Sequence, residues 1–389
     1  MWRSIASNAL TLFIMLLVAL AGLLAWGKQQ YEGPGPLDQA ICFRVERGAS
    51  FAAVSRALEA QGAVSDARIL RIGADYADKT QGLKFGSYLI QPGTSMADIV
   101  DQLTRGGQSS CGAEINYRIG VAAADIVLRE LDPATQRYEE VAKFDPATEA
   151  APAAYTEALA DPAIRLRVTL AEGTTVWQAV EALKRADFLA GDPGAPPPEG
   201  TLAPDSYEVA RGADRAALLA EMQARQTRIL ADLWAARAPD LPYRTPEEAL
   251  VMASIVEKET GVPDERGTVA SVFVNRLRAG MKLQTDPTVI YGVTRGQGVL
   301  GRGLRQSELR AATPWNTYVI DGLPPTPIAN PGRASIEATL NPPDTPFLFF
   351  VADGTGGHAF AETLAEHNAN VAKWRQIEAE RARNQPASP

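Results

Sequence analysis

The chain of 389 residues has few of the residues that build metal sites or bind nucleic acid. It contains two cysteines and two histidines, and its formal net charge is -8 at pH 7. A structural zinc site takes about four Cys or His ligands, and C-x-x-C spacing is absent. The sequence therefore predicts no metal and no cofactor, although a carboxylate-rich metal site stays open. The acidic excess argues against a nucleic-acid partner, because that binding depends on cationic contacts to phosphate.

Charged residues are also missing from a long stretch near the N-terminus. Residues 4–27 carry no charge and are mostly apolar, and Arg3 precedes them. A helix of this length crosses a bilayer core of about 30 Å, and the preceding arginine favours a cytoplasmic N-terminus. A cleaved signal peptide is the alternative, because residues 19–21 have the look of a cleavage site. We expect residues 1–30 to form a cytoplasmic tip and an uncleaved anchor, with the rest of the chain outside the cytoplasm.

The two cysteines lie at either end of the first extracytoplasmic segment. Cys42 starts the first expected strand, and Cys111 follows the last expected helix of that segment. In an oxidising compartment the two thiols can form a disulfide. They can equally be two small apolar side chains, and both interpretations stay open at this point.

A recurring pattern predicts an α+β fold. An apolar strand is followed by a turn with glycine, often a Ser or Thr cap, and an amphipathic helix with apolar residues three and four apart. The pattern starts near residues 43, 88, 115 and 167. Because the spacing between copies is irregular, the sequence indicates small α+β modules rather than a solenoid.

The order of elements in residues 42–106 is that of a small glycan-binding fold. We expect a strand, a helix, a second helix near residues 65–79, a strand and a further helix. The first four elements have the order of a LysM-like domain, a type that binds wall glycans. A spacer domain that binds nothing fits the same pattern equally well.

Composition divides the rest of the chain into three parts. Residues 107–200 are interpreted as an α+β linker region. Within it, residues 133–165 lack clean periodicity and suggest an irregular insertion, and residues 191–200 form a Pro- and Gly-rich surface loop. Residues 201–375 are expected to form the larger α+β domain. Residues 376–389 are interpreted as a flexible tail.

Two glutamates near the end of one helix are the best candidates for chemistry. Residues 245–248 form a capping box with proline in the first turn, which predicts a helix that ends near residue 260. At about 100° per residue, Glu259 lies on the apolar face and Glu257 lies opposite it. Burial of a carboxyl group disfavours its charged form and raises its pKa, as a general acid requires.

Both glutamates have a purely structural alternative. Glu257 is expected to be a solvated helix residue or an ion-pair partner. Glu259 could instead form a buried salt bridge, for instance with Arg276 or Arg278. We predict Glu259 to be the catalytic acid because of its expected environment.

A polar, loop-rich region follows the glutamate helix. It combines amide, carboxylate and aromatic side chains, and residues 323–332 add a stiff proline-rich segment. Sugar sites use this mixture of aromatic faces and polar groups. The predicted substrate-binding residues are Gln284, Asp286, Tyr291, Asn316 and Tyr318.

Six ordered motifs in this part of the chain carry a resemblance. ASIVEKET, SVFVNRL, LQTDPTVIYG, WNTY, GLPPTPIANPG and FLFFVADGTGGHAF closely resemble the MltG (YceG-like) family of endolytic murein transglycosylases. The likeness is dense over residues 202–373 and looser over the LysM-like region and the anchor. Residues 113–165 are longer than the family leads us to expect, and we assign them no role. The resemblance implies a single-pass anchor, a LysM-like domain and an extracytoplasmic catalytic domain.

The resemblance also implies a reaction that needs only one carboxyl group. The second glutamate of the EKE motif, Glu259, would protonate the oxygen between N-acetylmuramic acid and N-acetylglucosamine. Its carboxylate would then take the proton of the 6-hydroxyl of the muramic sugar, which closes on C1 to leave a 1,6-anhydro end. The expected substrates are peptidoglycan glycan strands, whose nascent length the enzyme would limit. Peptidoglycan synthases of the elongation or division machinery are a further expected partner.

The same resemblance implies a place in the cell. The enzyme is expected in the cytoplasmic (inner) membrane, with its catalytic domain in the periplasm. Two other functions remain as alternatives. One is a lysozyme-type hydrolase that uses Glu259 together with Asp286, since a hydrolase usually needs a second carboxylate. The other is a wall-binding scaffold without enzymatic activity.

Overall fold

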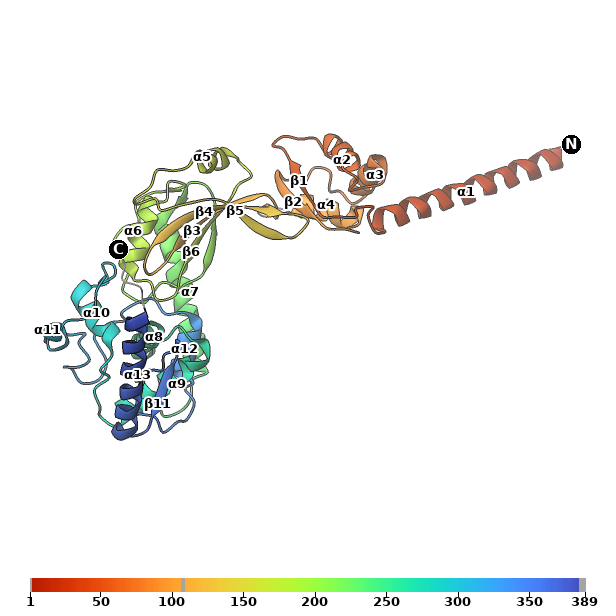
Figure 1. Ribbon diagram of the computed structural model, residues 1–389. Coiled ribbons are helices and arrows are strands. Elements are labelled where there is room, and N and C mark those ends of the chain that lie inside the picture. The colour runs from red at the N-terminus through yellow and green to blue at the C-terminus, as the bar shows by residue number, and fades with distance from the viewer. Residues whose placement is uncertain (1, 106–108, 385–389) are drawn as a thin grey trace. The chain divides into compact units, whose positions relative to one another are not determined.

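The computed structural model describes residues 2–105 and 109–384. Its helices and strands confirm the predicted α+β class (Figure 1). Two compact units are present. The first contains the chain up to Asn116 together with Val127–Lys143 and Ala151–Leu166. The second contains Tyr117–Ile126, Phe144–Ala150 and the chain from Arg167 onward.

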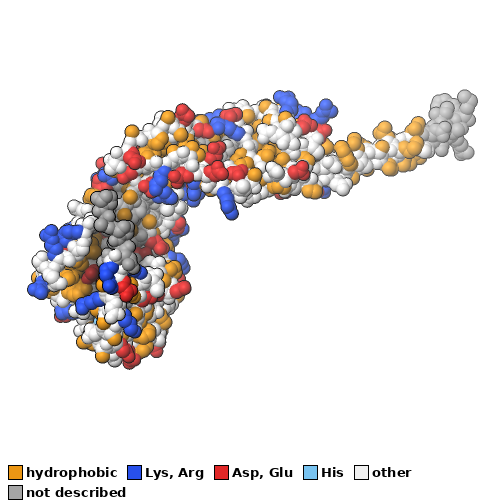
Figure 2. Space-filling model, in the orientation of Figure 1, with side chains coloured by type: hydrophobic (Ala, Val, Ile, Leu, Met, Phe, Trp, Pro, Cys, Tyr) orange, Lys and Arg blue, Asp and Glu red, His pale blue; other side chains and the backbone are white. Residues whose placement is uncertain are grey.

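The first unit begins with a long, exposed helix, α1 (Trp2–Glu32). Its part from Leu10 to Glu32 is long and apolar enough to cross a membrane. Hydrophobic side chains lie along the coloured part of this helix in the space-filling view (Figure 2), and large ones such as Leu16 and Leu24 are exposed. A signal sequence has the same properties. The helix is therefore consistent with the predicted single-pass anchor.

A small module follows α1 in the predicted order of elements. These are β1 (Ile41–Val45), α2 (Phe51–Ala60), α3 (Ala67–Tyr76), β2 (Gly86–Ile90) and α4 (Met96–Arg105). The two strands pair antiparallel, with Ile41 opposite Ile90. The side chains of Ser50 and Asp66 cap α2 and α3, as their positions predict. Whether this module resembles LysM domains in binding glycan stays a prediction.

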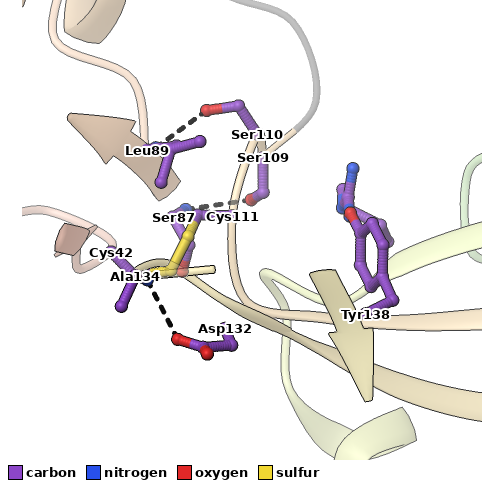
Figure 3. The surroundings of a disulfide bond; sticks show 10 residues. Cys42, Ser87, Leu89, Ser109, Ser110, Cys111, Asp132, Ala134 and Tyr138 are labelled. Carbon is purple, nitrogen blue, oxygen red and sulfur yellow. Dashed lines mark hydrogen bonds between the residues drawn. A yellow bond between two sulfur atoms is a disulfide. The ribbon is translucent and has the colours of Figure 1, made fainter. Parts of the chain in front are cut away.

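A disulfide between Cys42 and Cys111 decides the alternative that the sequence left open (Figure 3). The two Cα atoms are 5.6 Å apart. Next to the bridge, the N–H of Ser87 donates to Oγ of Ser109 at 2.9 Å, and the N–H of Ser110 donates to the carbonyl of Ser87 at 2.8 Å. The bridge and these bonds attach the segment after α4 to the edge of β2.

A five-stranded sheet comes next in the chain and has the order β5-β4-β3-β6-β8. Its strands are β3 (Ala113–Ile119), β4 (Ala124–Asp132), β5 (Arg137–Phe144), β6 (Arg165–Leu170) and β8 (Ser206–Val209). The other elements of this region are α5 (Ala153–Ala160), α6 (Val176–Arg185), β7 (Leu189–Ala190) and β9 (Ala213–Asp214). β7 and β9 pair in parallel.

The helix expected after the strand near residue 115 is wrong, because strand β4 lies there. The expectation of an irregular insertion over residues 133–165 is also wrong, because β5 and α5 lie there. Both elements are largely exposed. β5 is an edge strand that buries only Phe144, and α5 buries only Tyr155. Elements with so little buried surface show no strong hydrophobic periodicity, which is the signal that the sequence reading depends on.

The C-terminal part of the second unit is mainly helical. Its elements are α7 (Arg215–Ala235), α8 (Pro246–Glu259), the 3-10 turn η1 (Pro263–Glu265), α9 (Arg266–Arg278), α10 (Asp286–Thr294), α11 (Gln306–Leu309), α12 (Arg333–Leu340), β10 (Phe349–Ala352), β11 (His358–Ala361) and α13 (Leu364–Asn384). β10 and β11 form an antiparallel pair. α8 packs against α9 and α12, and Met252, Ile255 and Phe273 lie in the shared core.

Two helix boundaries bear on the sequence predictions. α8 begins after Thr245, whose hydroxyl accepts the N–H of Glu248, and it ends at Glu259, as the capping signals predicted. At the C-terminus, α13 continues to Asn384, so most of the predicted tail is helical. The last part of that predicted tail, residues 385–389, lies outside the described residues.

Candidate active site

Glu259 is the last residue of α8, at the point where this helix leaves the core. The preceding stretch Ala249–Val256 is entirely buried, whereas Glu259 is half-buried. Its Oε2 accepts a hydrogen bond of 2.8 Å from the hydroxyl of Thr285. Burial raises the pKa of the Glu259 carboxyl group, and the bond from Thr285 opposes this shift only in part. The site therefore shifts this carboxyl group toward its protonated form, which is the direction that a general acid requires.

Glu257 has a different and structural role. Its Oε2 accepts the backbone N–H of Gly332 at 3.0 Å and the hydroxyl of Ser335 at 2.7 Å. These groups lie at the start of α12, where backbone N–H groups have no partner within the helix. The expectation of a solvated residue or an ion-pair partner is therefore wrong for Glu257. It accepts hydrogen bonds at the N-terminus of a neighbouring helix.

The described residues do not form the salt bridge that was the predicted alternative for Glu259. Arg276 donates from Nε to the carbonyl of Leu348 at 2.7 Å and from a terminal nitrogen to the carbonyl of Leu283 at 2.6 Å. Arg278 donates to the backbone of Asp240. Within residues 2–105 and 109–384, neither guanidinium forms an ion pair with Glu259.

A cavity of about 450 Å³ opens beside Glu259. Helices α8, α9 and α13, strands β10 and β11, and the segment before α10 all contribute to its walls. The lining residues are Glu259, Arg276, Leu283, Gln284, Asp286, Tyr318, Phe349, Phe350, Val351, Ala352, His358, Leu364 and His367. The cavity thus combines carboxylates, an amide, a guanidinium and aromatic rings, which is the mixture expected of a sugar site.

Three of the five predicted substrate-binding residues line this cavity together with Glu259. The hydroxyl of Tyr318 donates to Oδ1 of Asp286 at 2.7 Å, and burial raises the pKa of Tyr318. Gln284 is exposed, and its backbone adopts a positive φ of 50°. Asp286 is also exposed at the start of α10. These side chains are available to a ligand in the cavity.

The structure does not bring the other two predicted residues to the cavity. The hydroxyl of Tyr291 donates to Glu199 at 3.1 Å, and its ring packs against Trp315. Asn316 is fully buried, and its amide donates to three backbone carbonyls between residues 308 and 311. Asn316 thus holds a loop in place, because its donors are all used within the protein.

Sequence reasoning missed Arg276, His358 and His367 as site residues. The chain contains only two histidines, and both line the cavity. His358 lies near the end of the last motif and His367 follows that motif, and this proximity was the available signal. His367 stacks on Phe349 with ring centroids 5.3 Å apart, and burial lowers its pKa. In the part of the chain that the structure describes, no cluster of His, Cys, Asp or Glu could hold a metal ion.

Two named relatives match this chain over very different lengths. A protein of Bacillus subtilis (strain 168) named endolytic murein transglycosylase is 42% identical over 125 residues, which cover 32% of this chain and 34% of that protein. A protein of the same name from Streptococcus pneumoniae serotype 2 (strain D39) is 28% identical over 94% of this chain and 66% of its own length. The chain therefore matches less than two thirds of the length of either relative.

Two further matches are to YceG-like proteins. The crystal structure of a yceG-like protein from Listeria monocytogenes is similar with a TM-score of 0.45 and 24% identity, over 85% of this chain and 99% of that one. Residues 43–373 match the YceG-like family. Because this match covers most of the sequence, the chain belongs to the YceG-like family.

Proposed function

We propose that this protein is an endolytic murein transglycosylase with Glu259 as its catalytic acid. The proposal rests on the carboxyl group of Glu259, which lies on the wall of a polar cavity. Burial raises the pKa of this group. A protonated glutamate near neutral pH is what cleavage of a glycosidic bond requires. The name that the relatives share supports the same reaction.

The reaction begins with proton transfer from Glu259 to the oxygen that joins N-acetylmuramic acid to N-acetylglucosamine. Positive charge then develops at C1 of the muramic sugar as the bond breaks. The 6-hydroxyl of the same sugar attacks C1 and leaves a 1,6-anhydro end without consuming water. In the simplest scheme, the carboxylate formed on Glu259 takes the proton of this hydroxyl. One carboxyl group is enough, because the substrate supplies its own nucleophile.

Gln284, Asp286 and Tyr318 would position the sugar by bonds to its hydroxyl and amide groups. Asp286 already accepts the Tyr318 hydroxyl at 2.7 Å, so this pair offers a fixed polar surface beside the acid. If Asp286 acted instead as a second catalytic carboxylate, the enzyme would be a lysozyme-type hydrolase. The two reactions differ in their products.

We further propose that α1 anchors the enzyme in the cytoplasmic membrane with its N-terminus inside. The LysM-like residues 42–106 and the catalytic residues 201–375 would then meet peptidoglycan in the periplasm. Residues 107–200 would connect these two parts. Cutting nascent strands in this position would limit their length, and the synthases that make them would be natural partners.

Mass spectrometry of glycan products tests the reaction. The full chain in detergent is incubated with purified sacculi and with uncrosslinked nascent strands. New 1,6-anhydro ends inside long strands support the proposal. New free reducing ends would identify a hydrolase instead. Absence of cleavage in both substrates, with binding retained, would favour the wall-binding scaffold.

A further inference from the structure

One of the two cavity histidines is held by a carboxylate. Nδ1 of His358 lies 2.8 Å from Oε2 of Glu265, and the backbone N–H of His358 donates to Oε1 of the same group at 2.9 Å. Both side chains are mostly buried, with exposed fractions of 16% for His358 and 20% for Glu265. Glu265 ends η1, the turn that follows α8, so the chain segment that carries Glu259 also carries the partner of His358.

This contact determines which nitrogen of the His358 ring can accept a proton. An ionised carboxylate can only accept hydrogen bonds, so Nδ1 of a neutral His358 ring carries the proton and Nε2 is an acceptor. No group among the described residues bonds to Nε2 of His358. This atom is also absent from the buried polar atoms that lack a partner, so it is open to solvent or a ligand. Because the ring lines the cavity, Nε2 is an accessible acceptor beside Glu259.

The second cavity histidine lacks this arrangement. Nδ1 of His367 is buried without a hydrogen-bond partner, and the ring stacks on Phe349. No carboxylate orients it within the described chain. In the described chain a carboxylate therefore orients His358 but not His367.

We propose that His358, oriented by Glu265, is the base of the ring-closing step. The proposal rests on the proposed transglycosylase function. Nε2 takes the proton of the 6-hydroxyl, and the oxygen forms a bond to C1. The bond from C1 to the glycosidic oxygen breaks, its electron pair stays on that oxygen, and Glu259 protonates it. Return of the proton from His358 to Glu259, directly or through solvent, restores both groups, and no water is consumed.

A second acceptor divides the two proton transfers between two groups of the cavity. In a catalytic triad a carboxylate on one ring nitrogen orients the imidazole for proton transfer at the other nitrogen, and Glu265 is placed to do the same for His358. The other charged or titratable groups around the cavity are Glu259, Arg276, Asp286, Tyr318 and His367. Glu259 then acts as the acid, and His358 acts as the base.

The test replaces each histidine by alanine in the full chain. His358→Ala should lower the initial rate of 1,6-anhydro end formation by about 100-fold or more, the usual effect of losing a general base. Binding of uncleaved strands should be retained. The melting temperature is measured beside it, because the substitution leaves Glu265 with only the backbone N–H at position 358 as a partner. Free imidazole should restore the rate in a concentration-dependent way, because the alanine leaves room for it beside the substrate. His367→Ala is the control, and imidazole should not change its rate.

The outcomes separate this inference from the proposed function. If the wild type forms no anhydro ends, the transglycosylase function itself is wrong. If the wild type forms them and His358→Ala does so equally fast, His358 is not the base, and the function stands. A loss that imidazole leaves unchanged, or a parallel loss of strand binding, would also overturn the base role. Recovery with imidazole in His358→Ala alone supports it.

Discussion

The two glutamates at the end of α8 lie two positions apart, and a pair of substitutions tests whether Glu259 rather than Glu257 is the catalytic acid. Glu259→Gln keeps shape and hydrogen bonding with Thr285 but cannot donate a proton. We expect a rate loss of 10²–10⁴, the typical effect of removing a general acid. The fold should be at least as stable, since no buried carboxyl group remains. Activity on nascent strands and the melting temperature are measured together.

Glu257→Gln should instead lower the stability of the protein and leave most of its activity. The amide that replaces the carboxylate would keep one oxygen near the start of α12 but lose the negative charge that favours this position. We expect a loss of about 1 kcal/mol in stability with most of the activity retained. A dead Glu257→Gln variant beside an active Glu259→Gln variant would contradict the assignment of both residues. A Glu259→Gln protein that is unfolded would instead indicate a structural role for that residue.

The raised pKa of Glu259 also predicts how stability depends on pH. Well below the unfolded value of about 4.3, the carboxyl group is protonated in both states and contributes nothing. As the pH rises, the unfolded chain ionises before the folded one, so the wild type loses stability until the folded pKa is passed. Glu259→Gln lacks this effect. Its melting temperature should exceed that of the wild type by a margin that grows with pH, and a margin independent of pH would contradict the raised pKa.

The residue scale also shows what the sequence could and could not predict. The position of Glu259 at the end of a helix and the rise in its pKa were predictable from capping signals and spacing. The argument from helix faces was incomplete, because Leu250 and Ala253 on the opposite face are buried as well. The role of Glu257 depends on Gly332, 75 residues away. Such a contact has no signal in the periodicity of one helix.

At the scale of elements, the disulfide between Cys42 and Cys111 should contribute strongly to the stability of its module. It closes a loop with a sequence separation of 69 residues. Such a loop corresponds to about 4 kcal/mol in the chain-entropy model. We expect Cys42→Ala to lower the urea midpoint of this unit, and Cys111→Ala to have a similar effect. The double variant should be little worse than either, because one bond is lost in all three.

A reducing agent gives the control for this prediction. It should destabilise the wild type and leave the double variant unchanged. If reduction does not alter the wild type, or if both thiols are alkylated without reduction, the bridge does not form in the protein. Additive losses in the double variant would show that the two side chains stabilise the module by packing alone.

Element prediction succeeded where local signals were strong. The helices α2, α6 and α8 each have a Ser or Thr cap and a buried apolar face, and all three were found from the sequence. β5 and α5 were missed, because each buries a single residue. The partners of the strands in the five-stranded sheet come from different parts of the chain, and their order could not be derived from spacing.

At the scale of the whole molecule, the family match leaves out the α1 helix. The match covers residues 43–373 and so begins after α1. The role of this helix is therefore argued from its own composition. A soluble protein rarely exposes an apolar surface of this size. Either lipid covers the helix, or a signal peptidase removes it. These two possibilities predict different mature proteins.

We expect α1 to remain in the mature protein as an anchor with the N-terminus inside. Arg3 before the apolar run and no other charge up to residue 27 favour this orientation. A phosphatase that is active only outside the cytoplasm, fused after residue 40, should therefore be active and should sediment with membranes. Deleting residues 4–27 from the same fusion is the control and should abolish activity. An inactive full fusion would indicate that the N-terminus lies outside. A mature chain that begins near Gly22 would show that α1 is a cleaved signal peptide.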